Sequence, residues 1–170
     1  GESRYNYPQI RFSARDEKAT RLAEIFNPPI RLIKANIPKS FRRIGFDLGI
    51  PVVVFEGGES LRLDEFSIEE GLRGIKRVLH EYQMSQFPIS IQPSELLAKS
   101  IWIRANNSGI FSFNVQAGRQ VHKGEILGNI ADPYGMNVVP VISTRRGTII
   151  CNNNKPVVFP GDPLFNIGIE

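Results

Sequence analysis

The sequence predicts an α/β layer followed by a small all-β domain. In residues 1–86, segments with helical periodicity alternate with short apolar runs, which is typical of a sheet covered by helices. Two prolines, Pro88 and Pro93, mark a connector at 87–99. In residues 100–170, short apolar runs are separated by glycines and polar turns, which is the pattern of an all-β domain.

The chain is expected to begin with an extended segment and a helix. Residues 4–14 contain a proline, which excludes a helix interior. A helix is predicted for 16–26, because apolar residues recur on one face and Ser13 or Asp16 can cap its start. It ends at Asn27-Pro28-Pro29, since proline cannot continue a helix.

A short strand and a short helix are expected next. Residues 30–34 can form a short strand, and 40–48 fits a helix with Ser40 as its N-cap. Gly49 suits the position just after the C-terminal cap. The apolar face of this helix consists of Phe41, Ile44 and Leu48.

A buried strand is predicted for residues 51–55. Four large apolar residues in a row, Val52 to Phe55, are typical of a parallel-sheet strand that is buried on both faces. Glu56 follows at once, and Gly57 and Gly58 allow the chain to turn sharply there. Because ligands of open α/β sheets bind outside the carboxyl ends of the strands, Glu56 is a candidate general base. The simpler alternative is that Glu56 only begins a polar loop.

The clearest helical pattern covers residues 67–82. Ser67 can cap its start, and two glutamates lie in the first turn, where they interact favourably with the helix dipole. Five apolar residues share one face, which is the pattern of a helix packed on a core: Ile68, Leu72, Ile75, Val78 and Leu79.

The β domain is expected to be a flattened barrel of two intertwined hammerheads. A weak internal repeat supports this expectation, because a strand, a turn with glycine and a second strand ending in isoleucine occur twice, from Gly109 and from Gly147. Glycines would occupy the tight corners. The predicted strands cover residues 101–105, 109–114, 126–130, 138–143, 147–151 and 164–169.

The composition limits which binding partners and which cellular compartment are expected. The net charge of +4 comes from scattered basic residues, which does not indicate a nucleic-acid binder. No apolar run approaches the roughly 20 residues that span a bilayer, so no membrane association is expected. The single cysteine, Cys151, excludes an internal disulfide and fits a reducing, cytoplasmic location. Its asparagine neighbours predict that it lies in a turn.

Motifs in both halves of the chain together resemble one protein family. The β domain is similar to the barrel-sandwich hybrid of biotinyl and lipoyl carrier domains, but the hairpin at 131–137 lacks the lysine that those carriers modify. The pattern GIF…V…G…V.KGE.LG.I.DPYG, followed by RRG.I and PVVFPGDPLF.I, instead resembles the C-terminal domain of the succinylglutamate desuccinylase/aspartoacylase family. Four earlier motifs resemble, in order, segments from the second half of its catalytic domain: R-Y-N-Y-P-x-I-R from Arg4, S-F-R from Ser40, G-I-P-V-V-V-F-E-G-G from Gly49 and L-D-E-x-S-I-x-x-G from Leu63.

The resemblance implies the C-terminal half of a zinc-carboxypeptidase-like α/β/α domain followed by a barrel-sandwich-hybrid domain. It implies a zinc-dependent hydrolase that removes the acyl group from a small N-acyl amino acid, or a related amide, through a metal-activated water. Glu56 matches the glutamate that takes a proton from that water and passes it to the departing amine. Arg42 matches an arginine before the G-I-P strand and, like Arg11, is expected to bind a substrate carboxylate. The alternative for Arg42 is a solvated arginine on a helix surface.

No metal ligand is expected in this chain. The family's zinc ligands, an H-x-x-E pair and a later histidine, lie upstream of the segments that match. His80 is predicted near a helix end, where a cation suits the dipole, and His122 in a polar turn, so neither is expected to bind metal. The chain alone is therefore predicted to be inactive. Its start at Gly1 fits a fragment, and association with a missing N-terminal half or with a second copy is expected.

Three other functions are weaker alternatives. A non-catalytic binding module built on the same two half-domains is the main one. A lysine-linked carrier is disfavoured because the hairpin at 131–137 lacks lysine. A nucleotide site is disfavoured because the glycines at 57–58 and 71–74 form neither G-x-G-x-x-G nor a P-loop.

Overall fold

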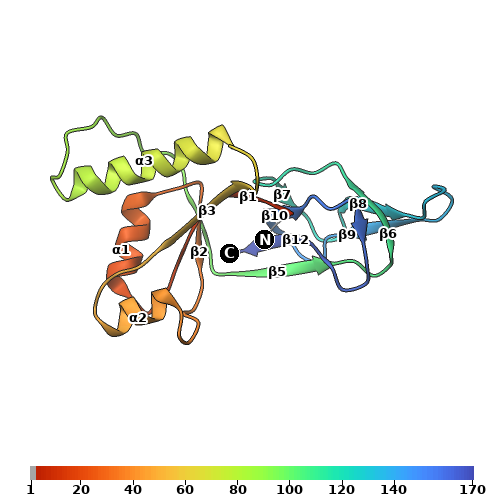
Figure 1. Cartoon of the computed structure of the whole chain (residues 1–170), viewed down its shortest axis with the longest axis horizontal. Helices are drawn as coiled ribbons and strands as arrows, with labels where there is room; N and C mark the ends of the chain where they lie inside the picture. The colour runs from red at the N-terminus through yellow and green to blue at the C-terminus, as the bar shows by residue number, and fades with distance from the viewer. Residues whose placement is uncertain (1–2) are drawn as a thin grey trace. The chain divides into compact units, whose positions relative to one another are not determined.

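In the computed structural model of the chain, which describes residues 3–170, two compact units can be distinguished (Figure 1). The α/β unit consists of Pro8–Gly58 and Arg62–Lys99. The β unit consists of Ser100–Glu170 together with residues 3–7 and Glu59–Leu61. Two strands, β1 (Arg4–Phe12) and β3 (Val54–Glu59), each begin in one unit and end in the other.

The sheet of the α/β unit has a parallel centre. Strand β1 pairs in parallel with β2, so that Gln9 lies opposite Ile30 and Arg11 opposite Leu32. Strand β2 pairs in parallel with β4, and β3 pairs with β1, which gives the order β4-β2-β1-β3. The strands are β1 (Arg4–Phe12), β2 (Ile30–Ile33), β3 (Val54–Glu59) and β4 (Glu95–Leu97).

Two helices, α1 (Glu17–Phe26) and α3 (Glu65–Glu81), cover one face of this sheet and contact each other. The core between them and the sheet contains Ile10, Phe12, Ala23 and Phe26, with Ile33, Val53, Phe55 and Val78 packed against it. The rings of Phe26 and Phe55 lie 5.4 Å apart between centroids. Alternation along β1 and β3 therefore directs Arg11 and Glu56 to the opposite face.

Caps fix the helix boundaries largely where the sequence predicts them. Asp16 caps α1 by accepting a hydrogen bond from the backbone N–H of Ala19, and Ser40 caps α2 (Phe41–Asp47) by accepting one from Arg43. Helix α3 begins earlier than predicted. Its N-cap is Asp64, whose side chain accepts a hydrogen bond from the backbone N–H of Ser67 at 2.9 Å, so Ser67 lies inside the helix.

The prediction of a strand at 51–55 that is buried on both faces is wrong. Strand β3 begins at Val54 and continues through Gly57 and Gly58, so Glu56 lies inside the strand and not at its end. Residues 51–56 are half-buried. The physical reason is the position of β3, because among residues 3–170 it pairs only with β1 and therefore lies at the edge of the sheet.

The predicted apolar faces of two helices are also wrong, since they do not face the core. On α2, Phe41 is 79% exposed and Leu48, just after the helix, is 69% exposed. On α3, the buried residues are Ser67, Glu70, Gly74 and Arg77, whereas only Val78 of the predicted face packs against the core. At Gly74 the helix faces inward without a side chain because a large ring lies beneath it: a Cβ added there would collide with the ring of Phe26.

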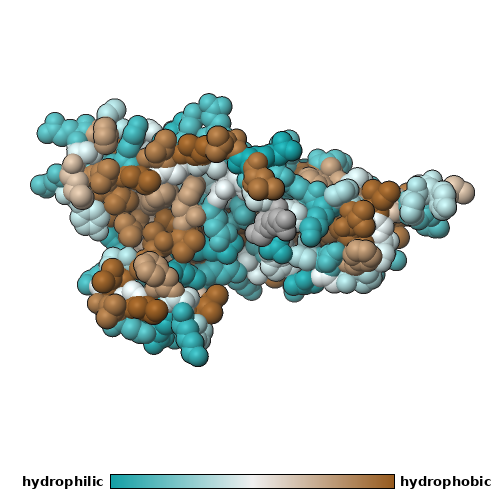
Figure 2. Space-filling view, in the orientation of Figure 1, coloured by the Kyte–Doolittle hydropathy of each residue, from teal (hydrophilic) through white to brown (hydrophobic). Residues whose placement is uncertain are grey.

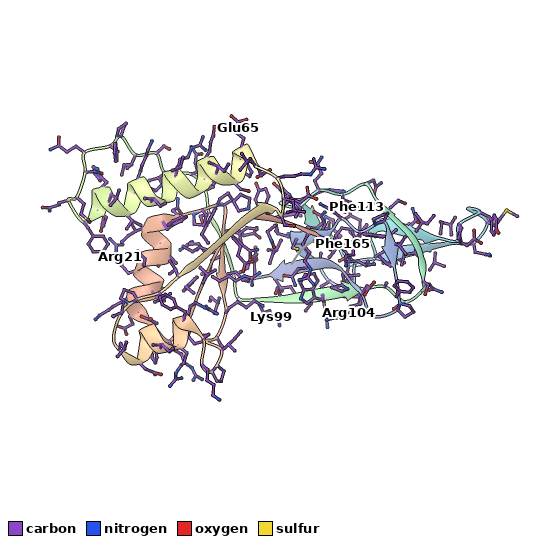
Figure 3. The ribbon with its side chains drawn as sticks, viewed as in Figure 1. Arg21, Glu65, Lys99, Arg104, Phe113 and Phe165 are labelled. Atoms are coloured by element: carbon purple, nitrogen blue, oxygen red, sulfur yellow. The ribbon has the colours of Figure 1, made fainter. Side chains whose placement is uncertain are left out.

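The β unit contains no helix among its described residues, as predicted, and has a core of its own. Strands β6, β8, β9 and β11 form an antiparallel sheet in the order β11-β6-β8-β9, while β10 pairs with β12, β7 and the start of β1. Figure 3 labels Phe113 and Phe165, whose rings meet edge to face with centroids 5.8 Å apart. The remaining bounds are β5 (Lys99–Arg104), β6 (Gly109–Phe113), β7 (Gln120–Val121), β8 (Ile126–Ala131), β9 (Val138–Ile142), β10 (Gly147–Asn153), β11 (Val157–Val158) and β12 (Pro163–Ile169).

Cys151 does not lie in a turn, which corrects the sequence prediction. It is 3% exposed within β10, opposite Asn6 of β1 and Asn166 of β12. The neighbouring asparagines are buried as well, and Asn153 donates a side-chain hydrogen bond to the carbonyl of Pro163. The strand can contain these buried asparagines because hydrogen bonds satisfy their side-chain amides.

No helix in the part of the chain that the structure describes is long and apolar enough to cross a membrane.

Candidate functional site

Arg11 and Glu56 form an ion pair on the face of the sheet opposite to α1 and α3. Arg11 Nη2 lies 2.8 Å from Glu56 Oε2, and their side chains are 32% and 31% exposed. Arg11 is the penultimate residue of β1, and Glu56 is the third residue of the adjacent β3. The pair therefore lies near the carboxyl end of β1, where open α/β sheets place their ligand sites.

Two further cations approach this pair from the loop after β2 and from α2. Lys34 follows β2 directly, and its backbone N–H donates to the carbonyl of Phe12 at 2.8 Å, which continues the β1–β2 pairing. Arg42 lies in the first turn of α2. Its Nη1 donates to the carbonyl of Lys34 and its Nη2 to the carbonyl of Ala35, each at 3.1 Å. Arg42 thus holds the loop that carries Lys34.

The charges of these groups act on one another. Burial lowers the pKa of Lys34, and the positive charge of Arg11 lowers it further. Burial also lowers the pKa of Arg42; Arg11 adds to this effect, while Glu56 opposes it by favouring the charged guanidinium. The positive charges of Lys34 and Arg42 thus both act on that of Arg11, and an anionic ligand would relieve this repulsion.

Gln9 extends the polar face of β1. It is fully buried, and neither side-chain amide atom has a hydrogen-bond partner among the described residues; the same holds for Nε of Arg11. Gln9 and Arg11 are two residues apart in one strand, so both side chains point to the same face. Buried polar atoms usually have partners, so these atoms indicate an ordered water or a ligand group. Sequence reasoning missed Gln9, although its spacing from Arg11 in an extended segment could have indicated it.

A groove with a volume of ≈ 450 Å³ opens among the segments that follow β1 and β2. Neither Arg11 nor Glu56 lines it, so the groove and the ion pair are separate features of the α/β unit. Arg43 reaches the groove from α2 but is paired with Asp47, whose Oδ1 lies 2.9 Å from Arg43 Nη2. The lining residues are Ser13, Ala14, Arg15, Ile33, Ala35, Asn36, Arg43 and Phe46.

The sequence singles out Arg11, Arg42 and Glu56 as site residues. In the structure these three residues make different kinds of contact. Arg11 and Glu56 touch directly, whereas Arg42 makes its hydrogen bonds to backbone carbonyls. Arg42 is not simply a solvated arginine on a helix surface, because the residue is half-buried and its hydrogen bonds hold a loop. The catalytic and substrate-binding roles of the three residues stay predictions.

The described residues of this chain do not fit a zinc site. Among residues 3–170, no three His, Cys, Asp or Glu side chains are grouped so that they could hold a metal ion. His80 is exposed in the last turn of α3, and His122 is exposed in the turn after β7. A catalytic zinc needs about three protein ligands, which would have to come from polypeptide outside these residues.

The hairpin between β8 and β9 is organised by a carboxylate. Asp132 accepts hydrogen bonds from the backbone N–H groups of Tyr134, Met136 and Asn137 at 3.0 to 3.1 Å. These bonds, with that from Met136 first, lower the pKa of Asp132. Tyr134 and Met136 are 88% and 81% exposed at the tip, which carries no lysine. The hairpin is therefore a well-ordered turn without the attachment point of a carrier domain.

Comparisons with known proteins identify the fold. No protein-family profile and no curated protein matches the chain in sequence. Among solved structures, the ectoine utilization protein EutE (DoeB) from Ruegeria pomeroyi matches 100% of the chain with a TM-score of 0.87 at 17% identity. A succinylglutamate desuccinylase from Silicibacter sp. TM1040 matches 99% with a TM-score of 0.83 at 19% identity. A succinylglutamate desuccinylase/aspartoacylase from Rhodobacter sphaeroides matches 100% with a TM-score of 0.82 at 20% identity.

The chain spans little more than half the length of these structures, since it covers 57%, 55% and 56% of them, respectively. The resemblance inferred from sequence motifs is thereby confirmed at the level of the fold. The α/β unit and the β unit together have the fold of the C-terminal portion of succinylglutamate desuccinylase/aspartoacylase structures.

Proposed function

We propose that this chain, which has the fold of the C-terminal portion of succinylglutamate desuccinylase/aspartoacylase structures, is part of an amide hydrolase that deacylates a small N-acyl amino acid or a related amide. Glu56 is the proton-transfer residue in this proposal. Arg11 and Arg42 bind a carboxylate of the substrate. The ion pair between Arg11 and Glu56, with Lys34 and Arg42 within electrostatic range of Arg11, is the observation on which the proposal depends.

Glu56 can act as a general base and then as a general acid. Its carboxylate would accept a proton from the attacking water and return that proton to the nitrogen of the departing amine, so no net proton is gained or lost by the side chain. The Arg11 guanidinium fixes the orientation of this carboxylate through the 2.8 Å ion pair.

The guanidinium groups can bind an anionic substrate. Guanidinium groups recognise carboxylates through two parallel N–H···O bonds, and both Arg11 and Arg42 are half-buried, where such bonds are stronger than in bulk water. Lys34 adds a third positive charge beside them. A substrate with two carboxylates would therefore bind better than a neutral amide of the same size.

In this proposal, a zinc ion would have to be bound by polypeptide outside residues 3–170. The chain holds no suitable group of ligands in its described part, so no step is assigned to a metal bound by its own side chains. We accordingly expect no turnover from the 170-residue chain alone, even with zinc added. Hydrolysis of an N-acyl amino acid by this chain and zinc would contradict that part of the proposal.

Titration with a dianionic amide tests the binding site directly. N-acetyl-L-aspartate is added to the isotope-labelled chain, and the NMR signals of backbone amides and arginine side chains are followed, with neutral N-acetyl-L-alaninamide as the matched control. The dianion should shift the signals of Arg11, Lys34, Arg42 and Glu56, and the neutral amide should leave them unchanged. If neither compound shifts these signals, the cluster does not bind substrate carboxylates, and the binding-module alternative gains support.

A further inference from the structure

A groove with a volume of ≈ 370 Å³ lies in the β unit, between two strands that each end a sheet. Strand β5 ends the order β4-β2-β1-β10-β12-β5, and β9 ends the order β11-β6-β8-β9. Residues of both strands line the groove, which therefore opens along two strand edges that have no neighbouring strand among residues 3–170. Since Arg11 and Glu56 belong to the α/β unit, this groove is separate from their ion pair.

Hydrogen bonds at the end of β5 show which backbone groups face β12. Ala105, just after β5, donates its N–H to the carbonyl of Asp162 at 2.9 Å and accepts a hydrogen bond from the N–H of Gly161 at 2.8 Å. Both of its backbone groups thus point toward the segment that leads into β12. The carbonyl of Ile101 points to the same side, because it accepts a hydrogen bond from the side chain of Asn166 in β12.

The N–H and C=O groups of Trp102 and Arg104 therefore point to the free edge of β5, since backbone groups of successive residues in a strand point to alternate sides. Both residues line the groove. The opposite wall differs, because Pro140 lies in the middle of β9, opposite Asn129 of β8, and has no N–H to donate. Proline makes a strand edge a poor template for a further strand. An added strand would thus pair with β5, and β9 would contribute side-chain contacts.

Side chains give the groove an apolar floor and a basic rim. The floor consists of Ile103, Ile130 and Val141, which belong to the core of the β unit and are each at most 6% exposed. Figure 2 shows further hydrophobic residues at the surface where Figure 1 labels β8 and β9. Arg104, labelled in Figure 3, lines the groove, and none of the described lining residues is acidic. Its Nη1 donates to the carbonyl of Gly161 at 2.7 Å, so further guanidinium N–H groups remain for an anionic partner.

We propose that an extended segment of another protein, in which acidic and apolar residues alternate, binds in this groove by adding a strand to β5. The side chain opposite Ile103 would point to the same face as Ile103 and fill the apolar floor. The neighbouring side chains would point to the other face, where an acidic group opposite Arg104 forms a charge-assisted contact. Main-chain hydrogen bonds would supply the affinity and the floor the preference for an apolar residue. This interaction does not depend on the proposed hydrolase chemistry.

A second copy of the chain fits the groove less well than a single extended segment. Its own β5 is already paired with β12 on one side, so the copy would bring two neighbouring strands into the groove. The second of these strands would meet β9, which forms the opposite wall. A single segment with no strand on its far side avoids this collision.

Titration of the isotope-labelled chain with the peptide Ac-Ser-Glu-Val-Glu-Val-Glu-Ser-NH2, followed by NMR, tests the proposal. At saturation, the exchange of the Trp102 and Arg104 amides should slow by about tenfold or more, because their N–H groups gain hydrogen bonds. The methyl signals of Ile130 and Val141 should shift, since these side chains lie in the floor. A copy of the peptide that is N-methylated at its central amides should not bind, because it lacks the donors of a strand. A copy with lysine in place of glutamate should bind about tenfold more weakly or worse.

Charge reversal at the rim is the second arm of the experiment. Arg104→Glu should weaken binding of the glutamate peptide by about tenfold or more and make the lysine peptide the better ligand. Lys123→Glu is the matched control, since it makes the same change of charge at an exposed residue of the β unit outside the groove, and it should leave binding unchanged. Melting temperatures show whether both variants fold. If Arg104→Glu does not fold, Arg104→Gln replaces it and should weaken binding of the glutamate peptide.

Three results would contradict the proposal. Equal binding of the N-methylated copy would exclude addition of a strand to β5. Protection of the Trp102 and Arg104 amides in a dimer of the chain, without peptide, would assign the groove to a second copy. No binding at about 1 mM peptide would overturn the proposal entirely, because even a weak strand addition is detectable at that concentration.

Discussion

Arg11 Nη2 lies 2.8 Å from Glu56 Oε2, although the two residues are far apart in the sequence and belong to different strands. The contact arises because β3 pairs with β1 and because alternation turns both side chains away from α1 and α3. The same face of β1 carries the buried, unpartnered amide of Gln9. Several polar groups thus converge on one face of the sheet. A few convergent polar groups are typical of a ligand site.

Glu56→Gln should abolish catalysis without disturbing the fold. The amide keeps the shape of the side chain but cannot accept a proton, so turnover by the assembled enzyme should fall by roughly 10²- to 10⁴-fold. The unfolding free energy of the chain should change by less than about 1 kcal/mol, because the lost ion pair is partly exposed. Turnover with an N-acyl amino acid and chemical denaturation measure the two effects. Unchanged turnover would remove Glu56 from the mechanism.

Arg42→Ala should loosen the loop after β2. The substitution removes two hydrogen bonds to the carbonyls of Lys34 and Ala35, each of which is worth about 1 kcal/mol in a partly exposed setting. Faster amide exchange in residues 34–36, measured by NMR, is the expected result, together with weaker binding of N-acetyl-L-aspartate.

Arg42→Lys is the matched variant for this prediction. It keeps the positive charge but cannot donate to both carbonyls in the same fork geometry. Binding should therefore be intermediate, while the loop should still exchange faster than in the unmodified chain. If the amides of residues 34–36 exchange as slowly in both variants as in the unmodified chain, Arg42 does not hold the loop.

The elements of this fold could be predicted from sequence more reliably than their burial. Asp16 and Ser40 cap helices where local side-chain chemistry indicates. Periodicity did not reveal which face of α3 packs inward, because the choice depends on the rings of Phe26 and Phe55, which come from distant segments. The glycines at 71 and 74 were the available signal, since large rings can approach a helix only where side chains are absent.

The candidate site could be predicted only in part. The apolar run before Glu56 indicated a strand, but no local pattern reveals which strands are its neighbours, so its position at the sheet edge and its contact with Arg11 were not foreseen. Arg42 was identified as a site residue through a resemblance. Its hydrogen bonds to the loop carbonyls depend on how the loop folds back on α2, which is a tertiary feature.

Gly74→Ala should destabilise the α/β unit although alanine favours helices. The added methyl group would collide with the ring of Phe26 and push α3 away from α1. Overpacking of this kind costs about 1 to 3 kcal/mol, which exceeds the gain in helix propensity of up to about 1 kcal/mol. Urea denaturation measures the difference. Lys76→Ala, at an exposed position of the same helix, is the control and should change stability little. Equal stability of the two variants would show that α3 can shift without cost.

Acid should loosen the β8–β9 hairpin through Asp132. Its pKa is lowered in the folded chain, chiefly because the carboxylate accepts hydrogen bonds from Met136 and its neighbours. A group with a lowered folded pKa contributes stability above its unfolded pKa and loses that contribution as the pH falls through the folded value, so the hairpin should loosen below about pH 4. Amide exchange and chemical shifts of Tyr134, Met136 and Asn137 report the transition. Asp132→Asn should remove the pH dependence, because its side chain does not titrate. A hairpin that loosens with the same pH profile in this variant would assign the transition to another carboxyl group.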